Sequence, residues 1–141
     1  SRRRYFRMRL PSCGSDHLKA WVPVALALSS AIVFGLSNVM YKLGLAHMGE
    51  VSVPRALSGR LILELLSSRT FVTAILLTAL AGALYILAIS RGEVTVVVAT
   101  LSVSYLVTAL LAWHILGEQL TLVRILGLAM IMAGVAAVNL A

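Results

Sequence analysis

The hydrophobic positions of the chain form four long runs that contain no charged side chain. The runs cover residues 20–41, 70–90, 94–117 and 125–141. A helix needs about 20 apolar residues to cross the roughly 30 Å hydrocarbon core of a bilayer. Three runs reach that length, and the fourth does so when it is counted from Leu122, with Arg124 at its mouth. The pattern predicts membrane spans at about 20–43, 71–90, 95–116 and 122–141.

These spans are expected to be helices, because backbone groups in lipid must be hydrogen-bonded within each segment. Basic residues precede the first run, as in a secretory signal, but the apolar part of a signal covers only about 7 to 15 residues. We therefore interpret residues 20–43 as a true span. The predicted fold class is an all-α membrane protein, with residues 20–141 as one four-helix transmembrane domain.

A different pattern lies between the first two spans. Leu57, Leu61 and Leu65 recur every four residues, and Arg60 and Glu64 occupy the adjacent polar side at one-turn spacing. This predicts an amphipathic helix at about 55–69. It is too short and too charged to span alone, so it lies at the membrane interface or extends the second span as a tilted segment.

Composition and charge agree with a membrane location. The chain is 60% hydrophobic and 12% charged, against roughly 25% charged residues in soluble domains. Its net charge of +7 could suggest nucleic acid, but six of the twelve basic residues precede the first span, which is the ordinary positive-inside signal. We therefore predict a basic tail at 1–19, no nucleic acid partner, and a multi-pass protein of the plasma (inner) membrane with cytoplasmic termini. The two sides carry seven and five basic residues, which leaves a dual topology open.

No arrangement typical of catalysis or of metal binding occurs in the sequence. The three histidines lie on three different segments, the five acidic residues lie at span ends or in loops, and no phosphate-binding glycine loop is present. We expect no enzyme activity, no metal and no cofactor. Proton-coupled export of lipophilic cations is also disfavoured, because it needs an acidic side chain within the membrane.

Polar side chains within the spans are the candidates for a binding site. On a helical wheel of the third span, polar residues gather on one arc, which should face protein or a cavity and not lipid; they are Thr95, Ser102, Ser104, Tyr105 and Thr108. Lys42 lies about 31 Å along a helix from Trp21, at the far interface, where it serves as an anchor and can contact an anionic headgroup. The predicted substrate-binding residues are Asn38, Tyr41, Lys42, Tyr85, Ser102 and Tyr105.

Small residues form a stripe along the fourth span. Gly127, Gly134, Ala137 and Ala141 recur at roughly seven-residue spacing. Small residues let helices approach closely, which is how helices associate in lipid. The stripe is either an intrachain contact or a dimer interface.

The stretch LSVSYLVTALLAWHILGEQLTLVRILGLAMIMAGVAAVNL, residues 101–140, closely resembles the final two helices of EamA-like domains in the drug/metabolite transporter superfamily, which includes the small multidrug resistance proteins. SNVMYKLGL, at 37–45, is similar to the end of their first helix. The resemblance covers about residues 25–141, and GEQLT with the following glycine-bearing helix is its most specific part. It implies a dimer, often antiparallel, with substrate between the first three helices and the fourth helix holding the dimer.

The chain departs from the multidrug exporters at the site that the resemblance implies. Phe34 stands where those exporters have a glutamate, and Val97 and Thr100 where they have an aromatic pair. The small subunits of aminoarabinose-phosphoundecaprenol flippases also lack this glutamate, and their third helix has a similar pattern. The resemblance therefore favours a transporter or flippase subunit for a small polar or lipid-linked substrate, acting as a homo- or heterodimer. The alternatives are a non-transporting subunit of a larger membrane complex and a cation/proton antiporter that uses Glu64.

Overall fold

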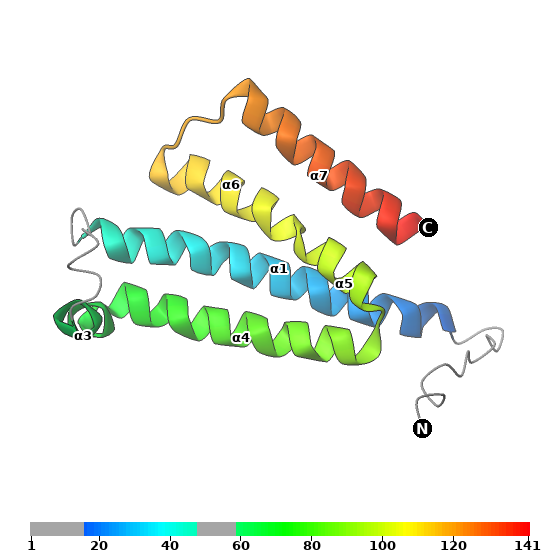
Figure 1. Cartoon of the computed structure of the whole chain (residues 1–141), viewed down its shortest axis with the longest axis horizontal. Helices are drawn as coiled ribbons and strands as arrows, with labels where there is room; N and C mark the ends of the chain where they lie inside the picture. Colours follow the sequence, from blue (N-terminus) through cyan, green and yellow to red (C-terminus); the bar gives the residue numbers. More distant parts are fainter. Residues whose placement is uncertain (1–15, 48–58) are drawn as a thin grey trace.

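The computed structural model describes residues 16–47 and 59–141, with side chains from Trp21 onward. Its helices are α1 (Asp16–Ala46), α3 (Gly59–Ser67), α4 (Arg69–Arg91), α5 (Val94–Leu101), α6 (Val103–Leu116) and α7 (Leu122–Leu140) (Figure 1). Four segments are long and apolar enough to cross a membrane: Trp21–Ala46, Arg69–Arg91, Val94–Leu116 and Leu122–Leu140. The predicted fold class is confirmed. Most of the predicted basic tail lies outside the described residues.

Helix α1 is the centre of the bundle. It packs along α4 on one side and against α5 and α6 on another (Figure 1). The buried apolar positions of α1 and α4 are mostly alanines: Ala27, Ala31, Ala74, Ala81 and Ala88. Such small side chains allow the close approach by which helices associate in lipid. One polar bond crosses this contact, because the buried Ser30 hydroxyl donates to the carbonyl of Ala81 at 2.8 Å.

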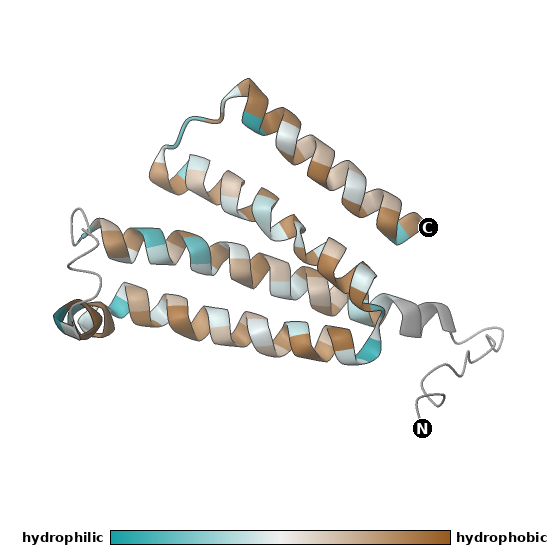
Figure 2. Cartoon of the chain, viewed as in Figure 1, coloured by the Kyte–Doolittle hydropathy of each residue, from teal (hydrophilic) through white to brown (hydrophobic). Residues whose placement is uncertain are grey.

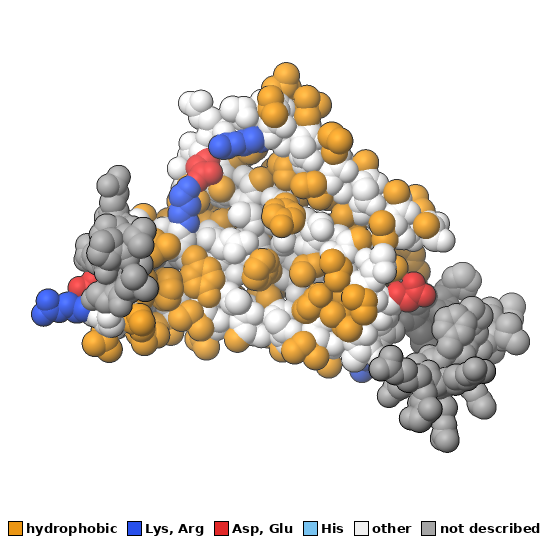
Figure 3. Space-filling model, in the orientation of Figure 1, with side chains coloured by type: hydrophobic (Ala, Val, Ile, Leu, Met, Phe, Trp, Pro, Cys, Tyr) orange, Lys and Arg blue, Asp and Glu red, His pale blue; other side chains and the backbone are white. Residues whose placement is uncertain are grey.

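The larger apolar side chains point outward. Leu76, Ile86 and Met130 are each more than 60% exposed. Apolar residues predominate along the long helices (Figure 2), and apolar side chains are spread over the face of the molecule in Figure 3. This arrangement is the reverse of a water-soluble core, where large apolar residues are the ones most often buried. A surface of this kind is suited to contact with lipid tails.

Helix α3 lies across the end of the bundle. Figure 1 shows it nearly end-on beside the start of α4, so it does not continue the direction of that helix. Leu61 is buried and Leu65 is half-buried, whereas Arg60 and Glu64 are exposed. Of the two predicted placements, this arrangement favours the interfacial helix over the extension of the second span. Leu57 lies outside the described residues.

The third span differs from the single helix that was predicted. It is interrupted at Ser102, where α5 ends and α6 begins. The Ser102 N–H donates to the carbonyl of Ala99, and the Tyr105 N–H donates to the carbonyl of Ser102, both at 3.1 Å. These bonds span three residues, the tighter spacing of a 3₁₀ turn, which often marks a strained or functional point in a helix.

Helix α7 is the least enclosed of the four long helices. It packs against α5 and α6, and none of its residues is buried. Gly117, with a φ of 66°, ends α6 in the left-handed conformation that favours glycine. Near the other end of α7, the Asn139 amide donates to the Thr100 hydroxyl at 3.3 Å, which ties α7 to α5.

Candidate functional site

A polar cavity of about 220 Å³ lies between α1 and the α5–α6 break. Its lining residues are Phe34, Asn38, Val98, Leu101, Ser102, Ser104 and Tyr105. Three predicted site residues from two spans, Asn38, Ser102 and Tyr105, therefore meet at one place. The break contributes to the site directly, because Ser102 itself lines the cavity.

Asn38 also connects α1 to α6. Its Nδ2 donates to Oγ1 of Thr108 at 3.3 Å, in a part-buried contact. An asparagine amide has two N–H donors and an acceptor oxygen, so this bond uses only one of its possible interactions. Thr108 was not among the predicted site residues. The sequence feature that could have identified Thr108 is its place on the polar arc of the third span, together with Ser104 and Tyr105.

A second, smaller cavity lies between α1 and α4. It has a volume of about 150 Å³ and is lined by Ser30, Phe34, Thr78, Ala81, Gly82, Tyr85 and Leu101. Tyr85 therefore lies in this cavity and not in the polar one. Phe34 and Leu101 line both cavities and form the wall between them. The aromatic ring of Phe34 is thus shared by the two cavities, and no residue that lines either cavity is acidic.

Tyr41 lies beside the second cavity and joins α1 to α4. Its hydroxyl is 3.1 Å from the Thr78 hydroxyl. Its ring meets Phe71 edge to face, with the ring centres 5.2 Å apart. Neither cavity has Tyr41 in its lining, so its visible contacts are those of helix packing.

Lys42 lies apart from both cavities, at the end of α1. It forms an ion pair with Glu118 of the α6–α7 loop, and the two side chains are 58% and 35% exposed. Exposed pairs of this kind contribute about 0–1 kcal/mol to stability. Sequence reasoning missed Glu118, because its partner lies far away along the chain.

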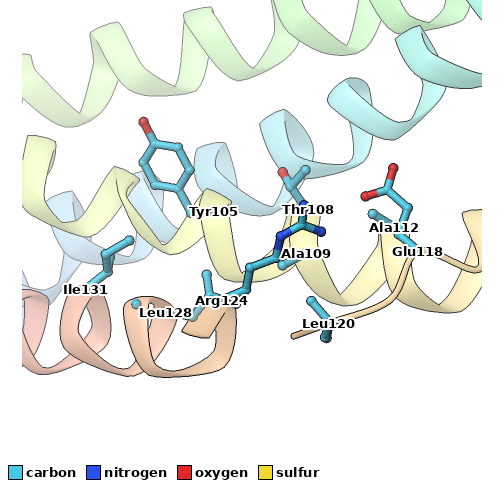
Figure 4. A pocket seen from close by; sticks show the side chains of 10 residues that line it. Tyr105, Thr108, Ala109, Ala112, Glu118, Leu120, Arg124, Leu128 and Ile131 are labelled. Carbon is cyan, nitrogen blue, oxygen red and sulfur yellow. The ribbon is translucent and has the colours of Figure 1, made fainter. Parts of the chain in front are cut away.

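A third hollow, the α6–α7 cleft, has a volume of about 390 Å³. Tyr105, Thr108 and Ala112 of α6 line it, together with Arg124, Leu128 and Ile131 of α7 (Figure 4). Tyr105 lines both this cleft and the polar cavity. Tyr105 therefore forms a wall between the cleft and the polar cavity, and the residue is 63% exposed.

The predicted small-residue stripe on α7 is exposed, and Gly127 also lines the α6–α7 cleft. Gly127, Gly134 and Ala137 are exposed. A Cβ added at Gly127 or Gly134 would meet nothing within 4 Å. Within the described chain, these two glycines make no close helix contact, and the intrachain interpretation of the stripe therefore loses its basis.

No cluster of three or more His, Cys, Asp or Glu that could hold a metal ion occurs in the described part of the chain. The side chains at the two cavities offer hydrogen bonds, aromatic surface and apolar surface. Such an arrangement can bind and position a molecule with polar groups. The four apolar helices around these cavities are those of a multi-pass membrane protein.

Comparison with protein families identifies which membrane protein class this is. Residues 21–140 match the EamA-like transporter family. The chain belongs to that family and thereby to the drug/metabolite transporter superfamily. Comparison with curated proteins and with solved structures gives no match.

Proposed function

We propose that the chain transports a small polar molecule or a lipid-linked polar headgroup through the polar cavity. One observation carries the proposal: the amide of Asn38 and the hydroxyls of Ser102 and Tyr105 line one cavity, and none of its lining residues is acidic. Asn38 and Ser102 are half-buried, and polar groups that lose contact with water need other hydrogen-bond partners. A cargo rich in oxygen atoms supplies such partners.

The chemistry of the lining disfavours a cation as cargo. A desolvated cation needs a negative charge nearby, and the two residues that the cavities share, Phe34 and Leu101, are both uncharged. N–H and O–H groups instead suit the oxygens of a sugar or a phosphate. If the headgroup carries a prenyl tail, the exposed side of Tyr105 lets the tail stay in lipid while the headgroup enters.

The proposed active form is a dimer. The polar cavity of one chain holds about 220 Å³, which is below the roughly 300–1,000 Å³ of typical ligand sites. Two such cavities that face each other would reach that range. The exposed Gly134 of α7 supports this form, since it lies outside the α6–α7 cleft and leaves room for a close helix partner.

The antiporter alternative receives no support from the position of Glu64. This residue lies on α3 at the end of the bundle, its side chain is exposed, and it lines neither cavity. A carboxylate that binds protons and cations alternately has to reach the transport path.

The cargo class can be tested with the chain reconstituted into lipid vesicles. One probe is a fluorescently tagged prenyl-phosphate sugar, whose transfer between leaflets is followed by chemical quenching from outside. The other is tetraphenylphosphonium, a lipophilic cation, with proton release recorded by a pH dye. We expect faster transfer of the first probe than in protein-free vesicles and no proton release with the second. Proton release with the cation and no transfer of the sugar lipid would contradict the proposal.

A further inference from the structure

The α6–α7 cleft combines an apolar wall with a cation at its mouth. Ala109, Ala112, Leu120, Leu128 and Ile131 supply most of the wall. Arg124, in the first turn of α7, extends across the cleft toward the Thr108 side of α6 (Figure 4). Helix ends of this kind lie at headgroup depth, where arginine side chains meet lipid phosphates.

The charges around the mouth do not cancel. Lys42 and Arg124 contribute +2 and Glu118 contributes −1, so the three side chains sum to +1. Figure 3 shows two basic groups on either side of an acidic group on this face of the molecule. Lys42 is paired with Glu118, whereas Arg124 donates from Nη1 to the backbone carbonyl of Gln119 at 3.3 Å.

Arg124 is suited to hold a phosphate. A guanidinium has five N–H donors in a planar fork that matches phosphate oxygens two at a time. The bond to Gln119 uses one of them. Glu118 also lines the cleft but is paired with Lys42, so an anionic occupant complements the charge of Arg124 better than a neutral one.

We propose that the α6–α7 cleft binds one anionic phospholipid. Its phosphate lies on Arg124, and an acyl chain lies along Leu128 and Ile131. The cleft volume of about 390 Å³ falls in the range of ligand sites that enclose part of a molecule. This lipid is not the transported cargo, and its binding does not depend on transport through the polar cavity.

The site shares residues with the polar cavity. Tyr105 lines both hollows, and Thr108 lines the cleft while it accepts the hydrogen bond from Asn38. A lipid seated in the cleft therefore contacts the residues that shape the polar cavity. The lipid fills the space between α6 and the poorly enclosed α7.

Native mass spectrometry of the purified full chain can count bound lipid directly. The probes are phosphatidylglycerol and phosphatidylcholine with identical acyl chains, each titrated in neutral detergent. We expect the wild-type protein to bind phosphatidylglycerol more tightly. Arg124→Gln should weaken that binding about tenfold, because a charge-assisted hydrogen bond is lost, while phosphatidylcholine binding stays unchanged. Arg124→Lys should retain part of the preference, since a lysine keeps the charge without the fork.

Arg69→Gln is the matched control. Arg69 is exposed and starts α4 at the same end of the bundle, so the variant removes the same charge outside the cleft. It should bind phosphatidylglycerol as the wild type does. Leu128→Trp keeps the charge and fills the wall, and it should also weaken phosphatidylglycerol binding.

Four results would overturn the proposal. They are equal binding of the two lipids, equal loss in Arg69→Gln and Arg124→Gln, unchanged binding in Leu128→Trp, and occupation of the cleft by a second chain. The last is tested with Leu128→Cys, because complete disulfide crosslinking of two chains in the presence of phosphatidylglycerol would show that protein, and not lipid, fills the cleft. None of these results bears on sugar-lipid transfer, which is measured separately.

Discussion

Among the glycines within the long helices, Gly35 has the least space for a Cβ atom, because α6 lies close to α1 there. Of the other glycines that the structure describes, only Gly92, in the turn after α4, has less. A Cβ at Gly35 would lie 2.7 Å from Cγ1 and 2.8 Å from Cβ of Val107, and 3.2 Å from the carbonyl oxygen of Ser104. The first two atoms belong to a β-branched side chain, which has little rotamer freedom in a helix. The third belongs to the backbone. Gly35→Ala therefore forces the two helices apart.

The size of the effect follows from two opposing terms. Replacement of glycine by alanine inside a helix gains about 1 kcal/mol, while overpacking a tight contact costs about 1–3 kcal/mol. Gly82→Ala is the matched control, because Gly82 is within α4 and a Cβ there would meet nothing within 4 Å. The control should gain up to about 1 kcal/mol, and Gly35→Ala should be less stable than the control by about 1–3 kcal/mol.

Unfolding of both variants by dodecyl sulfate in mild detergent, followed by circular dichroism, measures this difference. A stability gain in Gly35→Ala equal to that in Gly82→Ala would refute the close approach of α1 and α6. The same approach of the two helices places Asn38 beside Thr108. The refuting result would therefore also contradict the polar cavity, because α1 forms one of its walls.

Two further predictions concern α7. Asn139→Leu removes the bond to Thr100. It should lower the free energy of unfolding by about 0.6 kcal/mol, the average for hydrogen bonds between membrane helices. The same denaturant titration measures this loss, and an unchanged stability would show that the bond does not hold α7 to α5. Gly134→Leu meets open space within the chain, so the monomer should not lose stability and should gain up to about 1 kcal/mol from helix propensity. The same change should weaken dimer formation, as measured by crosslinking in vesicles, and a variant that dimerises like the wild type would exclude this part of α7 from the interface.

The fold class was predictable because the membrane imposes it. Runs without charge as long as 70–90 have one stable solution in lipid, a spanning helix, and the structure has α4 at Arg69–Arg91. The break at Ser102 was not predictable, since a helical wheel assumes one uniform rotation along the whole span. Nor does periodicity reveal that Gly35 touches Val107, because that contact depends on how two helices are placed against each other.

The candidate site was predictable in part for a related reason. A polar residue deep in an apolar run has to face the protein interior, and this holds for Asn38 and Ser102, which line the polar cavity. The argument weakens toward a helix end, where polar side chains reach water at little cost. Tyr41 and Lys42 lie there, and their partners Thr78 and Glu118 come from other segments that no local pattern connects to them.

The rate of sugar-lipid transfer in variants of the polar cavity tests the central claim most directly. Asn38→Leu, Ser102→Ala and Tyr105→Phe each remove one hydrogen-bonding group from its lining. Ser29→Ala and Thr73→Val are the controls, because these residues line neither cavity and, like Ser102, donate a hydroxyl to a carbonyl four residues earlier. We expect transfer by each cavity variant to fall about tenfold, as for the loss of one hydrogen bond to the cargo, with unchanged insertion and unchanged transfer in the controls. Transfer at the wild-type rate in all three cavity variants would contradict the assignment of the polar cavity as the transport site.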